Sequence, residues 1–221
     1  MSRPKAGYYT AAGKRVPGVT TVIAALKGDP GGLMHWAWQL GKDGKDYKVE
    51  RDNACSIGHC VHAMIEAHLL GGVFYPSPFA EILDNEDAAK KVRSAYDAYR
   101  QWRAGVNIEV IATEVPLVSE IHQYGGTLDL LARVNGALVI LDWKTSNHIY
   151  GDAVAQVAAY ARLVQETWGE LPEAGGLLRV GKDEGDFHLH YWPGSILTTA
   201  WEAFLAARKI YDLNKQLTKI L

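Results

Sequence analysis

The chain contains little cysteine and no long hydrophobic run, and both absences narrow its function. Its 221 residues include two cysteines, Cys55 and Cys60, which are too few for a four-thiolate zinc or iron–sulfur site within this chain. No apolar stretch approaches the ~20 residues that cross a bilayer, and the N-terminus lacks the apolar segment of a secretion signal. We therefore expect a cytoplasmic protein with reduced thiols and no membrane association.

The chain also lacks the strong positive charge that is typical of nucleic-acid-binding proteins. The net charge is −2 at pH 7, so composition gives no global basic signature. The charge is unevenly spread, because residues 1–50 hold eight Lys or Arg against four acids. Such a basic stretch is compatible with a phosphate backbone passing nearby, although a solvated surface is the better explanation for any single lysine.

The order of secondary-structure signals predicts the fold class. We predict helices from about residue 21 and at 30–41, 56–72, 86–104, 151–169 and 195–218, and strands at 8–10, 107–119, 126–134, 137–144, 175–181 and 186–192. The strand over 107–119 is expected to be interrupted at Pro116. Helix, three strands, helix and strand indicate an α/β protein, or α+β with a central mixed β-sheet flanked by helices.

We find no internal repeat or low-complexity linker, so residues 1–221 are expected to form a single domain. We divide it into a basic and aromatic lead-in at 1–50, a core at 51–192 and a C-terminal helix at 193–221.

The stretch GTLDLLARVNGALVILDWKTS, residues 126–146, carries the strongest functional signal. Asn135-Gly136 between two apolar runs predicts a two-residue hairpin turn. Asp129 then lies directly opposite Asp142 in a non-hydrogen-bonded pair, whose Cα atoms are about 4.5 Å apart. Strand alternation places Lys144 on the same face as Asp142. The opposite face should carry the apolar residues Leu128, Leu130, Ala132, Val139, Leu141 and Trp143.

Two facing carboxylates destabilise an apolar sheet unless something compensates them. One acid could stay protonated, Lys144 could neutralise part of the charge, or a cation could bind between them. Oxygen-rich sites of this type suit Mg²⁺ or Mn²⁺. A metal that polarises a phosphoryl oxygen, beside a lysine that steadies the attacking water, would hydrolyse phosphate esters. The alternative is a surface salt bridge between strand ends.

At these residues the sequence resembles the PD-(D/E)XK nuclease superfamily, and most closely its RecB-like exonuclease branch. Gly126 to Asp129, followed by Asp142-Trp143-Lys144, is similar to the paired acid and D-x-K motifs. G-x-x-x-H at Gly58 to His62 and Q-x-x-x-Y at Gln156 to Tyr160 add to the likeness. The resemblance implies the restriction-endonuclease-like core of this superfamily and a bacterial or phage-infected cell as host.

The resemblance also implies roles for individual residues. The metal ligands would be Asp129, Asp142, His62 and the backbone carbonyl of Trp143, with Glu114 on the preceding strand serving a metal ion and catalysis. Lys144 would position or activate the water. Gln156 and Tyr160 would support the site and contact DNA. A histidine on a helix is often only structural, and the alanines around Gln156 could serve packing alone.

Trp36 and Trp38, in the basic lead-in, are candidates for stacking on unpaired bases, although most tryptophans serve core packing. The implied function is a metal-dependent deoxyribonuclease, most simply an exonuclease on single-stranded DNA or DNA ends in recombination or repair. A structure-selective endonuclease and a non-catalytic DNA-binding module of the same fold are the alternatives. Because a G-x-x-x-x-G-K-[ST] motif is missing, the chain is not a motor–nuclease fusion. It would bind DNA unaided or through a recombination or replication partner protein.

Overall fold

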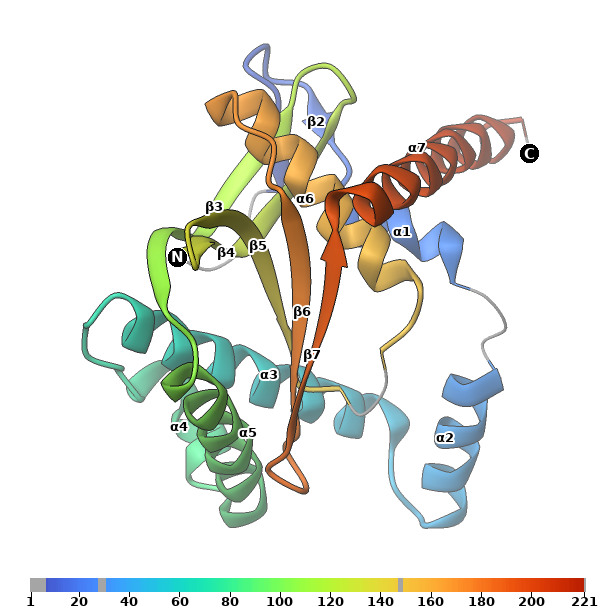
Figure 1. Ribbon diagram of the computed structural model, residues 1–221. Coiled ribbons are helices and arrows are strands. Elements are labelled where there is room, and N and C mark those ends of the chain that lie inside the picture. Colours follow the sequence, from blue (N-terminus) through green and yellow to red (C-terminus); the bar gives the residue numbers. More distant parts are fainter. Residues whose placement is uncertain (1–6, 28–30, 147–148, 221) are drawn as a thin grey trace.

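The computed structural model describes residues 7–27, 31–146 and 149–220 (Figure 1). The helices are α1 Val19–Ile23, η1 Ala24–Leu26, α2 Gly31–Lys42, α3 Tyr47–Leu69, η2 Ser77–Phe79, α4 Ala80–Leu83, α5 Glu86–Ala104, α6 Asp152–Trp168 and α7 Gly194–Leu217. The strands are β1 Tyr8–Tyr9, β2 Arg15–Val16, β3 Ile108–Ser119, β4 Tyr124–Val134, β5 Ala137–Lys144, β6 Ala174–Val180 and β7 Phe187–Pro193.

The centre of the fold is a five-stranded sheet in the order β3-β4-β5-β6-β7. Neighbouring strands are antiparallel except β5 and β6, which are parallel. A parallel connection needs a crossover, and α6 supplies it between β5 and β6. The prediction of a mixed sheet flanked by helices is confirmed.

The hairpin between β4 and β5 has the predicted turn and register. Asn135 and Gly136 both have positive φ, 52° and 90°, as a type I′ turn requires. The paired residues run from Val134 opposite Ala137 to Leu130 opposite Leu141. This register is the one that brings Asp129 and Asp142 to the same level of the sheet.

Two hydrophobic cores lie on opposite faces of the sheet. Helices α1, α6 and α7 cover one face, and α3 and α5 cover the other. We expected Leu128 to lie on the same face of the sheet as Leu130, in the core under α3 and α5, and this prediction is wrong. Leu128 packs in the core beside α6, as Leu131 does. The alternation of β4 side chains between the two faces of the sheet therefore shifts by one residue around Asp129.

Strand β3 does not break at Pro116, and that prediction is wrong. Pro116 pairs with Thr127 in the ladder, as a proline can on an edge strand because its missing N–H faces outward. The irregularities lie earlier. The register shifts between Val110 and Ala112, and Glu114 has a φ of 51° with no partner in the ladder.

The helix boundaries differ from the predictions mainly at N-termini. Helix α3 begins at Tyr47 rather than near residue 56, because the Asp46 side chain caps it by accepting from the N–H groups of Lys48 and Val49. Helix α1 begins at Val19 rather than Thr21. The expected helix start at Pro30 lies outside the described residues.

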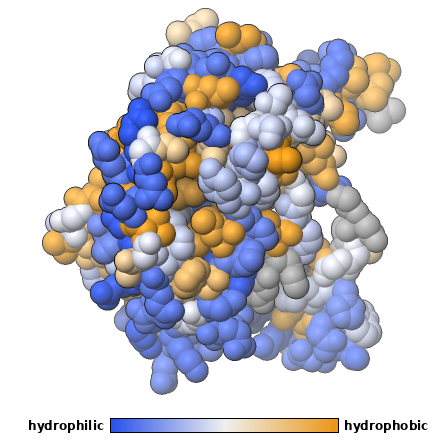
Figure 2. Space-filling model, viewed as in Figure 1, coloured by the Kyte–Doolittle hydropathy of each residue, from blue (hydrophilic) through white to orange (hydrophobic). Residues whose placement is uncertain are grey.

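The surface mixes residue types in the view of Figure 2, where hydrophobic patches lie among hydrophilic residues. Among the described residues, no helix has the length and hydrophobicity needed to cross a bilayer.

Candidate active site

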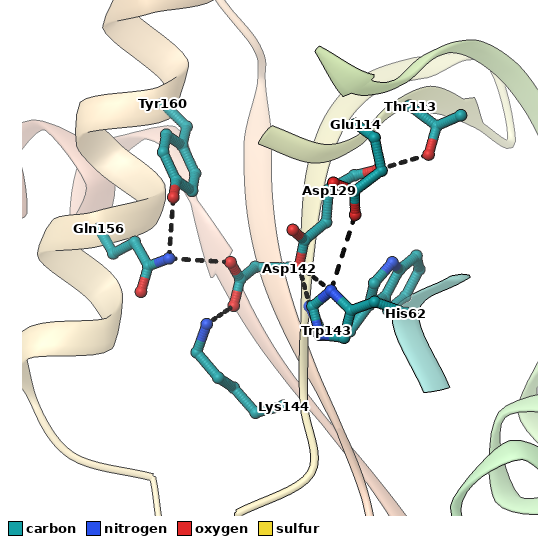
Figure 3. Close-up of polar contacts among 9 residues, drawn as sticks. All are labelled: His62, Thr113, Glu114, Asp129, Asp142, Trp143, Lys144, Gln156 and Tyr160. Atoms are coloured by element: carbon teal, nitrogen blue, oxygen red, sulfur yellow. Dashed lines mark hydrogen bonds and ion pairs between the residues drawn. The ribbon is translucent and has the colours of Figure 1, made fainter. Parts of the chain in front are cut away.

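Three neighbouring strands bring one acid each to the same region of the sheet (Figure 3). Glu114 comes from β3, Asp129 from β4 and Asp142 from β5. Asp129 and Asp142 are buried, with exposed fractions of 8% and 1%. Neither Glu114 nor Asp129 takes part in the β3–β4 ladder, which pairs the residues on both sides of them. The pairing between β3 and β4 is therefore interrupted at the position of these two acids.

His62 of α3 faces two of these acids. Its Nδ1 lies 3.7 Å from Glu114 Oε1 and 3.6 Å from Asp129 Oδ2. One ligand atom from each of the three residues lies within 4.8 Å of the others. Asp142 lies outside this group.

The Asp142 carboxylate has partners of its own, on the α6 side of the sheet. Its Oδ2 forms an ion pair with the Lys144 ammonium, and its Oδ1 accepts a 3.0 Å hydrogen bond from Gln156 Nε2. The same Gln156 nitrogen donates to the Tyr160 hydroxyl at 3.0 Å. Lys144, Asp142, Gln156 and Tyr160 thus form a connected chain (Figure 3).

The Asp129 carboxylate has a different partner, the backbone of β5. The Trp143 N–H donates to Asp129 Oδ2 at 2.9 Å. The register of the hairpin would have directed that N–H to the carbonyl of Leu128. Asp129 and Asp142 thus meet at one level of the sheet, but their carboxylates point to different partners. Trp143 packs its own side chain into the α3 and α5 core.

Burial and the close acids shift the pKa values at the site. Burial lowers the pKa of His62, but the carboxylates of Asp129 and Glu114 outweigh this effect, so the pKa lies above its usual 6.5. Burial raises the pKa of Asp142 to about 6, against the opposing effect of Lys144 and with a further rise from Asp129. The site therefore concentrates negative charge that a cation would stabilise.

A profile of the PD-(D/E)XK nuclease superfamily matches residues 31–193, which include all the charged groups at this centre. The chain belongs to the PD-(D/E)XK nuclease superfamily. A search of curated protein sequences found no match.

A comparison with solved structures found a candidate exonuclease and an alkaline exonuclease among its matches. A candidate exonuclease from Eubacterium rectale is 17% identical with a TM-score of 0.45, over 70% of this chain and 64% of that protein. This chain thus spans less than two thirds of the length of that protein. LHK-Exo, the alkaline exonuclease of Laribacter hongkongensis, in complex with dAMP, is 13% identical with a TM-score of 0.35, over 76% of this chain and 92% of that one.

The residues of this superfamily member fit a hard divalent cation. His62, Glu114 and Asp129 offer one imidazole nitrogen and carboxylate oxygens, a donor set that Mg²⁺ and Mn²⁺ accept. The negative charge of the site favours a cation as much as the donor atoms do, since the carboxylates of three acids lie close together in a largely buried place. PD-(D/E)XK nucleases use divalent metals, and this group is where the chain could bind one.

Two glycines let helices come close to the site. A Cβ at Gly58 of α3 would lie 3.2 Å from Thr145 Oγ1, so the glycine lets the end of β5 approach the helix that carries His62. A Cβ at Gly126 of β4 would lie 2.5 Å from Tyr160 Cε1.

Sequence reasoning missed Thr113, which precedes Glu114 on β3. Its hydroxyl donates to the carbonyl of Asp129 at 2.7 Å and so ties the two irregular strand segments together (Figure 3). No motif signals this role, because it depends on the β3–β4 register. Glu114 itself is placed by its own left-handed backbone, and not by an interruption of the strand at Pro116.

The two tryptophans of the lead-in lie on α2, apart from the acidic centre. Trp36 makes an edge contact with Tyr47 of α3, and Lys42 lies 4.5 Å from the centre of a Trp38 ring. Both side chains are exposed. Helix α2 packs against α3 and stands away from the sheet in Figure 1.

A cavity of about 500 Å³ adjoins the site at Tyr160. Arg15 and Lys215 are its charged lining residues, and no acid from the described part of the chain lines it. Gly126 and Tyr8 belong to the same wall, and the Tyr8 hydroxyl contacts Thr127 Oγ1 at 3.0 Å. The strand that carries Asp129 therefore forms part of the wall of this cavity.

Proposed function

We propose that the chain is a Mg²⁺- or Mn²⁺-dependent deoxyribonuclease, acting as an exonuclease on single-stranded DNA or DNA ends in recombination or repair. The observation that carries the proposal is the meeting of His62, Glu114 and Asp129 within 4.8 Å, with the Asp142–Lys144 ion pair beside them. Superfamily membership supports the same reading, and so does the likeness to the RecB-like branch.

The group of His62, Glu114 and Asp129 would hold the cation, with Asp142 and the Trp143 carbonyl as further ligands. When bound, the cation supplies charge that polarises a phosphoryl oxygen and lowers the pKa of a water. Asp129 also accepts from the Trp143 N–H, which fixes the orientation of its carboxylate before any metal or substrate arrives. Such fixed orientation reduces the reorganisation that the reaction would otherwise require.

Lys144 is the residue that we assign to the attacking water and the developing phosphate charge. Asp142 holds its ammonium by an ion pair, and Gln156 holds the other oxygen of Asp142. The Tyr160 hydroxyl accepts from Gln156 and so holds the amide that contacts Asp142. Gln156 and Tyr160 are positioning residues in this scheme, and Tyr160 also contacts DNA.

The cavity beside Tyr160 is where we place the DNA strand close to the reacting phosphate. Arg15 and Lys215 give it positive charge, and the described residues add no opposing acid to its wall, which suits a phosphodiester. The exposed rings of Trp36 and Trp38 would stack on unpaired bases further along the strand. A recombination or replication protein would bring longer DNA to the enzyme in the cytoplasm of a bacterial or phage-infected cell.

The test is a cleavage assay with linear duplex, linear single-stranded and closed circular DNA, with Mg²⁺, Mn²⁺ or EDTA. We expect metal-dependent loss of the linear substrates and survival of the circles. Cleavage of closed circles would instead identify an endonuclease. Absence of metal-dependent cleavage on all substrates, with DNA still bound, would leave only a binding module.

Matched lysine variants test the chemistry at the site. Lys144→Ala should reduce cleavage by at least about 10²-fold, because it removes the lysine ammonium group beside the phosphate. Lys91→Ala is the control, since Lys91 of α5 forms an ion pair with the exposed Asp87 and its loss should leave cleavage unchanged. Full activity in folded Lys144→Ala protein would refute the assignment.

A further inference from the structure

Strand β7 forms an outer edge of the central sheet that no other described strand covers. It pairs with β6 on one side, from Pro193 opposite Ala174 to Phe187 opposite Val180. The Gly181 N–H donates to the Asp186 carbonyl at 2.7 Å, just beyond the last pair. Because hydrogen-bonded pairs alternate, the backbone groups of residues 187, 189 and 191 point away from β6.

The side chains of this edge are unusually open to solvent. Phe187, Leu189 and Tyr191 lie on one face of the strand and are 41%, 37% and 58% exposed. No Asp, Glu, Lys or Arg occurs between Phe187 and Pro193. Charged residues on an edge strand normally discourage pairing with another chain, and β7 has none.

The opposite edge of the same sheet shows the contrast. Strand β3 has a register shift at residue 111 and a left-handed residue at Glu114. It also contains Glu109 and Pro116. Bulges, charges and proline are the features by which natural sheets protect an edge. Strand β3 has all three features, whereas the proline of β7, Pro193, is its last residue, and Phe187 to Trp192 have no bulge, charged residue or proline.

The sequence of β7 is close to a palindrome, since Phe-His-Leu-His-Tyr reads nearly alike in both directions around Leu189. In an antiparallel pair of two copies centred on Leu189, Phe187 faces Tyr191 of the other copy on each side. Aromatic residues opposite one another stabilise such pairs. The outward backbone groups of 187, 189 and 191 would also meet one another, so register and hydrogen bonding agree.

We propose that β7 pairs with β7 of a second copy of this chain around a two-fold axis through Leu189, joining two sheets into one. The axis is perpendicular to the sheet, so the face that carries Asp142 and α6 lies on the same side in both copies. Both candidate active sites would then open toward the same side of the dimer.

Mass measurement tests the pairing. Light scattering on the full chain at concentrations up to about 100 µM should show a rise from 24.3 kDa toward twice that mass. Leu189→Lys puts like charges opposite each other and should keep the chain monomeric. Leu213→Lys is the control, because Leu213 is similarly exposed, at 41%, on α7 and should leave the dimer intact.

A cysteine cross-link tests the register. Leu189→Cys places two cysteines in a hydrogen-bonded pair with Cα atoms about 5.5 Å apart, within disulfide range. The background should be Cys55→Ser, since Cys55 is exposed and Cys60 is buried. Oxidation should link two copies of the Leu189→Cys variant and should not link a Leu213→Cys control. Hydrogen exchange at the amides of 187, 189 and 191 should slow as concentration rises.

Several outcomes would overturn the proposal. A chain that remains at 24.3 kDa throughout, with rapid exchange at these amides, would leave the β7 edge for a different partner. A dimer that survives Leu189→Lys, in protein shown to be folded by circular dichroism, would place the interface elsewhere.

Discussion

Glu114 combines backbone strain with charge at the candidate active site. Its φ of 51° lies in the left-handed region, which costs a residue with a Cβ roughly 1–2 kcal/mol. That conformation takes Glu114 out of the β3–β4 ladder and directs its carboxylate to His62. Strain of this kind persists only where surrounding structure holds it, and the Thr113 bond to the Asp129 carbonyl is one such hold.

Two substitutions at this position separate strain from charge. Glu114→Gly and Glu114→Ala both remove the carboxylate, but only glycine adopts a φ of 51° without steric cost. We expect the Gly variant to be more stable than the Ala variant by about 1 kcal/mol, measured by urea unfolding without metal. Both should lose cleavage to a similar degree. Equal stability of the two variants would mean that the left-handed backbone stores no strain.

Strand β4 and helix α6 show how a single element contact supports the site. Gly126 lies against the ring of Tyr160, and Tyr160 is buried. Through Gln156, the same tyrosine is connected to Asp142. The distance between β4 and α6 therefore determines the positions of the Gln156 and Tyr160 side chains.

Gly126→Ala should destabilise the protein by about 1–3 kcal/mol, because the new methyl group would lie 2.5 Å from a buried ring. Cleavage should fall more than stability explains, since displacing Tyr160 disturbs Gln156 and Asp142. Gly41→Ala is the matched control in α2, where a Cβ would meet nothing within 4 Å. It should stabilise the fold by about 0.5–1 kcal/mol. Thermal and urea unfolding measure both, and an unaltered Gly126→Ala protein would contradict the contact.

At the scale of the whole molecule, the fold gathers the carboxylates of Glu114, Asp129 and Asp142 in one place. The folded chain alone does not fully neutralise their negative charge. Two cores on opposite faces of the sheet hold α3 and α6 in place. These helices bring His62 to Asp129 and Glu114 from one side, and Gln156 to Asp142 from the other. A divalent cation should therefore bind the folded chain and not the unfolded one, which makes its effect on global stability a test of the site.

Mn²⁺ at about one hundred times its Kd should stabilise the folded protein by roughly 3 kcal/mol, which is about 5–10 °C in Tm for a chain of this size. His62→Ala should lose most of this shift, because it removes one of the three grouped ligands. His35→Ala is the control, since His35 lies on α2 beside Trp38. A full shift in folded His62→Ala protein, measured by calorimetry, would place the metal elsewhere.

The amino-acid sequence was enough to predict the fold class, the hairpin register and the approximate position of most long elements. These depend on local chemistry, such as Asn135-Gly136 in a left-handed turn and the periodic apolar faces of α5 and α6. The hairpin pattern indicated Asp129, Asp142 and Lys144, and the resemblance to the superfamily indicated the other residues that gather at one place.

The way in which those residues meet depends on contacts between elements that are distant in the sequence. The slip of β4 at Asp129, the left-handed Glu114 and the bond from the Trp143 N–H to Asp129 all depend on partners distant in the chain. The same holds for the division of the acids into a His62 group and an Asp142–Lys144 pair. Local patterns fix which face a strand presents, but packing between elements fixes where a ladder opens, and that decides which oxygen faces which partner.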